Sequence, residues 1–153
     1  MKLLSIAVAA ALLSFGATAQ PSGSGEDDAV KVRYIVTDVD TAVSFYTHNL
    51  GFHLAAQAGR NFAMLSRGSL QLVLSPPSGP GGASQPASDG RRPEPGGWNR
   101  IILESRDLSA DVESLRRAGV HLRSGILSGP GGRQIVLEDP AGNPVELFQP
   151  GGN

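Results

Sequence analysis

An internal repeat limits what this chain can fold into more than any other feature of its sequence. Gly-Phe-His-Leu at 51–54 returns as Gly-Val-His-Leu at 119–122. Around each copy the same patterns follow in the same order: a β-branched stretch, an aspartate, a helical stretch and three short strand-like stretches. A unit of the type βαβββ cannot bury both faces of its sheet alone, so the two copies are expected to pair.

The first copy predicts one helix and four strands. Residues 31–37 are rich in β-branched and aromatic side chains, which favours a strand. Asp38 is suited to cap a helix in which apolar residues recur at helical spacing, and Gly51 ends it. Three more strands are predicted at 52–58, 62–66 and 69–75. Leucines alternate in the last strand, so Gln71 and Val73 are expected to point away from the core.

The second copy repeats this order. It predicts a strand at 99–105, a helix capped by Asp107 and ended by Gly119, and a turn at 129–132. The further strands are predicted at 120–124, 134–138 and 144–148. The sequence therefore predicts an α+β fold of two modules, which span residues 30–76 and 98–149.

A long irregular loop joins the two modules. Residues 77–97 are dominated by glycine, proline and serine and have no periodicity, and loops of this length are often functional. The loop exit places Trp98, Asn99 and Arg100 side by side. An indole beside guanidinium groups is suited to a flat or anionic ligand. Alternatively, Trp98 covers the edge of the hydrophobic core.

The first residues have the layout of a secretory signal peptide. A positive start at Met1-Lys2 precedes an apolar run, and Ala17-Thr18-Ala19 gives the small-x-small pattern of a cleavage site. We expect a signal peptide at 1–19 and a flexible leader at 20–29. The apolar run is too short to span a membrane, so the expected mature protein is secreted or periplasmic and carries no membrane span. An uncleaved anchor is the alternative.

Charge and composition exclude several classes of function. There are 13 basic and 14 acidic residues, and the net charge of -1 lacks the basic surplus that nucleic acids require. The absence of cysteine excludes disulfides, thiolate nucleophiles and cysteine-based metal sites. His53 and His121 occupy equivalent positions in the two copies, which favours a packing or surface role for both.

Two stretches resemble a known superfamily. The first is Asp-Val-Asp-Thr-Ala-Val-Ser-Phe-Tyr-Thr-His-Asn-Leu-Gly-Phe at 38–52, and the second is Glu-Asp-Pro-Ala-Gly-Asn-Pro-Val-Glu-Leu-Phe at 138–148. They are similar to two signatures of the vicinal oxygen chelate superfamily. Glyoxalases, bleomycin-resistance proteins and extradiol dioxygenases belong to it. The resemblance spans about residues 30–149 and implies two βαβββ modules that pair their curved mixed sheets around a cleft.

The resemblance also implies where a metal would be held. In the metal-dependent members, four side chains from the two modules bind a divalent ion. Spacing places these positions on Lys31, on Val73 or less readily Gln71, on Arg100 and on Glu146. An ammonium, a guanidinium and an aliphatic side chain cannot coordinate a cation. We therefore expect no metal and no other cofactor, with a divalent metal as the alternative.

If this register is right, Lys31, Arg100 and Glu146 converge where the ion would lie. The two cations would then hold an anionic or aromatic small molecule, and Glu146 would act as a catalytic base or a hydrogen-bond acceptor. Trp98, Asn99, Val73 and Gln71 complete the predicted ligand-binding set. The alternative interpretation is a salt-bridge network that only stabilises the fold.

Three functions remain open at this point. The first is a metal-independent protein that binds a small molecule outside the cytoplasm. The second is a glyoxalase-like lyase or isomerase, or a dioxygenase-type enzyme, with an atypical site. The third is a structural or protein-interaction domain on the same fold. A homodimer is also possible in each case, with the modules paired within one chain or exchanged between two.

Overall fold

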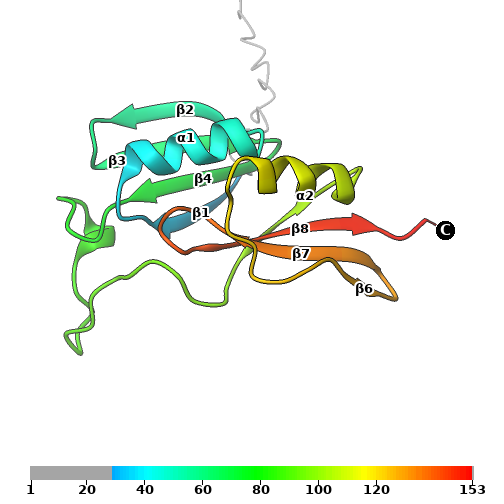
Figure 1. Cartoon of the computed structure of the whole chain (residues 1–153). Coiled ribbons are helices and arrows are strands. Elements are labelled where there is room, and N and C mark those ends of the chain that lie inside the picture. The colour runs from blue at the N-terminus through cyan, green and yellow to red at the C-terminus, as the bar shows by residue number, and fades with distance from the viewer. Residues whose placement is uncertain (1–28, 153) are drawn as a thin grey trace, which may run out of the picture.

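The computed structural model describes residues 29–152, and these form two modules with the same order of elements (Figure 1). The predicted signal peptide and nearly all of the predicted leader lie outside the described residues. No described helix has the length and apolar character that crossing a membrane requires.

The first module forms one four-stranded mixed sheet. Its elements are β1 Val30–Ile35, α1 Val39–Asn49, β2 His53–Ala58, β3 Phe62–Arg67 and β4 Leu70–Ser75. The strand order is β1-β4-β3-β2, in which β1 runs parallel to β4 and the other neighbours are antiparallel. The strands predicted for this half are all confirmed, with ends displaced by at most two residues.

The second module repeats this topology. Its elements are β5 Ile101–Glu104, α2 Leu108–Arg117, β6 Leu127–Gly129, β7 Gly132–Glu138 and β8 Pro144–Pro150. The order β5-β8-β7-β6 mirrors the first sheet, and neither sheet closes into a barrel. The predicted α+β fold of two βαβββ modules is therefore confirmed.

One strand prediction in this module is wrong. Residues 120–124 form no strand, and only an isolated bridge joins Leu122 to Leu137. The outer strand of the sheet is β6, in which Leu127 pairs with Gln134 across the glycine-rich turn that ends at Gly132. The turn at 129–132 sets the register of the residues next to it, so residues 127–129 pair with β7. The apolar stretch 120–124 lies further upstream and forms no ladder with β7.

Aspartate caps begin both helices, as the sequence predicted. Asp38 Oδ1 accepts a hydrogen bond from the Thr41 backbone N–H at 2.7 Å, and Asp107 Oδ1 accepts one from Ala110 at 3.0 Å. These bonds satisfy backbone donors that have no partner within the first turn of a helix.

A single hydrophobic core extends through both modules. Leu72 and Leu74 on β4, Leu108 on α2 and Leu137 on β7 are completely buried in it. The alternation predicted for β4 therefore holds. Because both sheets turn one face to this core, their other faces lie on the outside of the paired modules.

Buried tyrosines join the two modules at this core. The Tyr34 hydroxyl donates to the Pro144 carbonyl at 2.8 Å and accepts from the Ile101 N–H at 3.0 Å. The Tyr46 hydroxyl donates to Asp139 Oδ2 at 3.0 Å. These bonds bridge residues that lie 110, 67 and 93 positions apart in the chain, and they fix how the second module lies against β1 and α1.

The loop between the modules is irregular, as predicted, apart from the short 3-10 turn η1 Gly82–Ser84. In Figure 1 it leaves the end of β4, passes along the outside of the molecule and enters β5. Ser84 is buried, and its hydroxyl donates to the Pro76 carbonyl at 2.7 Å. The first part of the loop is thus attached to the first module.

Candidate functional site

The outward face of the first sheet carries two cations. Tyr34 points to the core, so its neighbours in odd positions on β1, Lys31 and Arg33, point outward and are exposed. Pairing of β1 with β4 aligns Lys31 with Gln71 and Arg33 with Val73 on this face. We call the surface formed by Lys31, Arg33, Gln71, Val73 and Ser75 the first open face.

The outward face of the second sheet is more apolar. Ile102 is paired with Glu146, and Gln134 is paired with both Leu127 and Phe148. Ile102 is 60% exposed and Leu127 is 55% exposed. We call the surface formed by Ile102, Leu127, Gln134, Glu146 and Phe148 the second open face.

Glu146 is bound to Arg100. The Arg100 Nε donates to Glu146 Oε2 at 2.6 Å, and the two side chains are 31% and 5% exposed. Arg100 also donates to the Trp98 carbonyl at 3.4 Å. The structure thus brings together two of the three charged residues that were predicted to converge. Within residues 29–152, Lys31 forms no ion pair or side-chain hydrogen bond with either of them.

These residues do not fit a divalent metal. Lys31 and Arg100 are cationic donors without a lone pair to offer, and Val73 is aliphatic. Glu146 is a suitable ligand, but one of its oxygens already accepts from Arg100. Gln71 would add an amide oxygen if it took the place of Val73, which still leaves two ligands where an ion needs three or four. In the part of the chain that the structure describes, no group of three or more His, Cys, Asp or Glu side chains could hold a metal ion.

Gln71 carries a buried acceptor without a partner. Its Oε1 is shielded from solvent and accepts no hydrogen bond in the described structure. Buried polar atoms in proteins are nearly always satisfied by the protein, by water or by a ligand. On the first open face, the acceptor of Gln71 is therefore left unsatisfied by the described protein groups.

A cavity of about 370 Å³ adjoins Arg33 on the same face. Phe62 and Asn61 line one side of it, and the loop segment 80–84 forms the opposite wall. Arg33 donates to the Ser75 hydroxyl at 2.5 Å and forms no ion pair among the described residues. The predicted ligand-binding residues did not include Arg33. Its outward position, two residues after Lys31 on the same strand, was the signal that could have identified it.

Trp98 is 81% exposed, so the alternative that it covers the edge of the core is wrong. The Arg123 guanidinium lies over its ring, with 5.4 Å from Cζ to the ring centroid. Asn99 is exposed beside it. The cation that accompanies the indole therefore comes from Arg123, outside the loop, and the other face of the indole can accept a flat molecule.

Glu138 holds Arg123 in this position. Its Oε1 accepts from Arg123 Nε at 2.6 Å, and its Oε2 lies 2.8 Å from His121 Nδ1. The hydrogen bond from Arg123, opposed in part by desolvation and aided by His121, lowers the pKa of Glu138 below the ordinary glutamate value. Arg123 also donates to the Gly97 carbonyl at 3.2 Å, which ties down the exit of the loop.

Solved structures of several bacterial proteins are similar to this one. TnmS3, an antibiotic-binding protein from Streptomyces sp. CB03234, is 29% identical with a TM-score of 0.58, over 79% of this chain and 93% of that chain. A glyoxalase/bleomycin resistance protein/dioxygenase superfamily member from Sphaerobacter thermophilus is 28% identical with a TM-score of 0.62, over 78% and 94%. Lactoylglutathione lyase from Agrobacterium tumefaciens, at 20% identity and a TM-score of 0.60 over 84% and 94%, shows likeness of fold alone.

No curated protein sequence matches this chain. The family model described as "Glyoxalase/Bleomycin resistance protein/Dioxygenase superfamily" matches residues 29–147, which include the first module, the loop and the second module as far as the middle of β8. The repeat, the topology of both sheets and this match agree, and the chain belongs to the glyoxalase/bleomycin resistance protein/dioxygenase superfamily.

Proposed function

We propose that this chain is an exported protein that binds a small anionic molecule without a metal. The observation that carries the proposal is the ion pair between Arg100 and Glu146. Glu146 is the one carboxylate at the four positions where metal-dependent superfamily members hold their ion, and Arg100, which pairs with it, occupies another of these positions. A cation would have to displace Arg100 from Glu146 before it could bind there.

The first open face supplies the binding groups. Lys31 and Arg33 are exposed cations on one strand, and the cavity beside Arg33 has Phe62 on one wall. A volume of about 370 Å³ lies within the range of small-molecule sites. These features favour a ligand with a flat apolar body and an anionic group that reaches the Arg33 guanidinium.

The solved structures give independent support for a binding role. The antibiotic-binding protein is 29% identical and nearly all of it is covered, so its printed role is a reasonable guide to the class of ligand. The lyase is less similar and supports the fold only. A binding protein is therefore the first candidate. The positions of Arg33 and Glu146 are explained by binding and by ion pairing, without a role in a chemical reaction.

A second copy of the chain is proposed to cover the second open face. Ile102 and Leu127 expose most of their apolar surface there, and Phe148 lies between their strands. Burying such a patch favours self-association. We expect light scattering to show a dimer, and Ile102→Asp to give a monomer. A wild-type protein that is monomeric at high concentration would contradict this part of the proposal.

Export is proposed from the layout of residues 1–19 alone. When the full-length chain is expressed in a bacterium with a periplasm, we expect the purified protein to begin at or near Gln20. Mass spectrometry of the intact protein measures this directly. A cytoplasmic protein that still begins at Met1 would contradict export.

The metal-free nature of the site is tested by measuring the metal content of the purified protein. Calorimetric titration of the same sample with Ni²⁺, Zn²⁺, Co²⁺, Mn²⁺ and Fe²⁺ follows. We expect no stoichiometric binding, because Glu146 and at most the amide oxygen of Gln71 are suitable donors at these positions. Tight binding of one ion per chain that is lost in Glu146→Gln would overturn the proposal and favour a metal-dependent enzyme.

The role of Arg33 is tested with matched probes. We expect 2-naphthoate to bind more tightly than the uncharged 2-naphthamide, because only the carboxylate can form charge-assisted hydrogen bonds with the guanidinium. Arg33→Gln should remove this difference, whereas Arg92→Gln, an exposed arginine in the loop, should keep it. Equal binding of the two probes to wild type, or no binding of either, would contradict an anion site at Arg33.

A further inference from the structure

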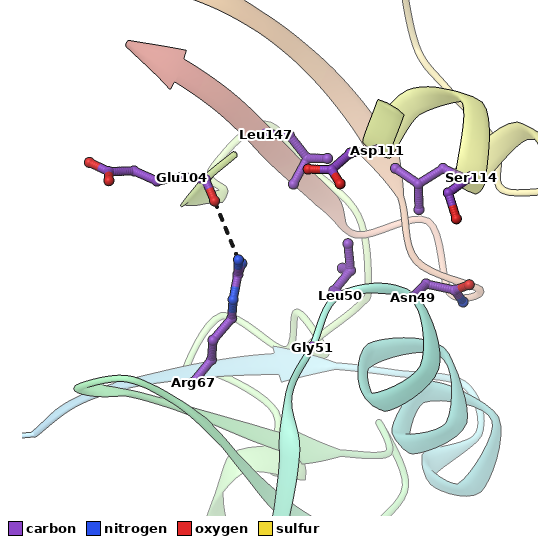
Figure 2. Close-up of a pocket in the computed structure, with 9 residues that line it drawn as sticks. Asn49, Leu50, Gly51, Arg67, Glu104, Asp111, Ser114 and Leu147 are labelled. Carbon is purple, nitrogen blue, oxygen red and sulfur yellow. Dashed lines mark hydrogen bonds between the residues drawn. The ribbon is translucent and has the colours of Figure 1, made fainter. Parts of the chain in front are cut away.

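A second cavity lies at the junction of the two modules (Figure 2). It has a volume of about 230 Å³ and is lined from both halves of the chain. Arg67 and Asn49 come from the first module, and Asp111 and Ser114 come from α2 in the second. The superfamily ligand positions at Lys31, Val73, Arg100 and Glu146 are not among its lining residues.

The floor of this cavity is apolar. Leu50, Leu115 and Leu147 line it, and each is at most 5% exposed because it also belongs to the shared core. The other lining residues are polar apart from Gly51, so this cavity is more polar than most small-molecule sites and is suited to a charged ligand. The volume is below the range of about 300–1,000 Å³ typical of drug-sized ligands, so this cavity is suited to a molecule the size of an amino acid.

Two opposite charges reach the cavity from the two modules. Arg67 donates one hydrogen bond, to the Glu104 carbonyl at 3.3 Å, and forms no ion pair within residues 29–152. Asp111 accepts from the Ser105 hydroxyl at 2.6 Å and is likewise in no ion pair within that range. In Figure 2 the Glu104 side chain points away from Asp111, and Arg67 extends from the first module to the Glu104 carbonyl, to the left of Asp111.

We propose that this cavity binds a small zwitterion, with its carboxylate on Arg67 and its ammonium group on Asp111. The guanidinium has donors left for a carboxylate, since its one bond here is long and is made to a neutral carbonyl. The second oxygen of Asp111 is free to accept from an ammonium group. Asn49 and Ser114 add neutral hydrogen-bonding groups at the rim. A bound zwitterion would bridge the two modules.

The ligand class follows from this pairing of charges. A purely anionic molecule would be repelled by the Asp111 carboxylate, and a purely cationic molecule would be repelled by the Arg67 guanidinium. The site does not depend on the function proposed for the open faces. Binding here and binding at Arg33 can therefore succeed or fail separately.

The experiment is a titration of the ¹⁵N-labelled protein with glycine, β-alanine and 4-aminobutanoate, followed by amide chemical shifts. We expect at least one of the three to shift the Gly51 and Ser114 amides in a saturable manner. The length of the best ligand then reports the separation of the two charges. The N-acetyl and the carboxamide derivatives of the best ligand, which each lack one charge, should bind at least about tenfold more weakly than that ligand, because each removes one charge-assisted contact.

Two variants test the assignment of the charges. Arg67→Gln and Asp111→Asn each remove a charge and keep a hydrogen-bonding group, and Asp111→Asn also keeps the size of the side chain. Each variant should weaken binding about tenfold or more. Arg92→Gln should bind as the wild type does. The proposal is overturned if no zwitterion of the series shifts these amides, if the shifts appear around Arg33 and Ser75 instead, or if both variants bind like wild type.

Discussion

Arg100 donates from its Nε to Glu146 Oε2 at 2.6 Å, and this bond joins the start of β5 to the middle of β8. Glu146 is almost fully buried, whereas Arg100 is about one-third exposed. A buried carboxylate is tolerated because the guanidinium neutralises it, and neither side chain can be removed alone without leaving the other unpaired.

Removal of the arginine should therefore destabilise the protein. We expect Arg100→Gln to lower the free energy of unfolding by up to about 3 kcal/mol, at the lower end for buried pairs because Arg100 is partly exposed. Combining it with Glu146→Gln should restore part of this loss, because the buried charge is then gone. Urea denaturation of the two single variants and the double variant measures the coupling.

The exposed pair of Glu113 and Arg116 on α2 provides the control for this cycle. Its atoms are 2.7 Å apart, but both side chains are more than half exposed. Arg116→Gln should change stability by about 0.5 kcal/mol or less. Equal effects of Arg100→Gln and Arg116→Gln would mean that Glu146 does not depend on Arg100.

The Tyr34 hydroxyl should contribute to the docking of the two modules. It pairs with the Ile101 N–H and the Pro144 carbonyl, and burial raises its pKa, so it remains protonated at neutral pH. Tyr34→Phe leaves both backbone groups without this partner, and we expect a loss of about 2–3 kcal/mol. Ser124→Ala, which removes an exposed hydroxyl, is the control. Unchanged unfolding of Tyr34→Phe in urea would contradict a role in docking.

Gly132 should be irreplaceable at the start of β7. Its φ is +142°, and a Cβ there would collide with the Gln149 carbonyl oxygen on β8. We expect Gly132→Ala to cost about 3 kcal/mol or more, because the clash is with backbone of the paired strand. Gly68→Ala, at a turn with φ +58° and no atom within 4 Å of the added Cβ, should cost about 1 kcal/mol. Thermal unfolding compares the two, and similar losses would contradict the expected clash.

Glu138 should make stability depend on acidic pH. Its pKa is lowered in the folded protein, chiefly by the hydrogen bond from Arg123. A group with a lowered folded pKa stabilises the protein above its unfolded pKa, about 4.3 for glutamate. This contribution is lost as the pH falls through the lower folded value. Urea denaturation at neutral pH and near pH 3 should therefore show a smaller acid-induced loss in Glu138→Gln than in wild type, and equal losses would contradict the prediction.

Most of the architecture could be predicted because its signals are local. Asp38 and Asp107 cap helices whose periodicity is readable over one turn, and the leucines of β4 alternate at the period of a strand. The failure at 120–124 has the opposite cause. An apolar stretch indicates that a strand can form there, but it does not determine the pairing partner. The turn ahead of Gly132 decided which residues pair with β7.

The candidate site was less predictable, since its geometry depends on contacts between distant residues. The sequence marked Arg100 and Glu146 as neighbours of one site, but it left open whether they would face a ligand or each other. Val73 was expected to point away from the core, and it does so, yet it is 7% exposed because neighbouring side chains cover it. The partner of Trp98, Arg123, lies on a segment that no pattern connects with the loop.

By itself, the sequence determined the repeat, the caps, the order of the elements and the poor donor set at the superfamily metal positions, because each depends on residue type and short spacing. Only the tertiary structure decided that Arg100 neutralises Glu146, that Arg33 and the loop share a cavity, and that Arg67 and Asp111 line one cavity at the module junction. These relationships arise when two sheets pack on one core, and packing brings together side chains that are far apart in the chain.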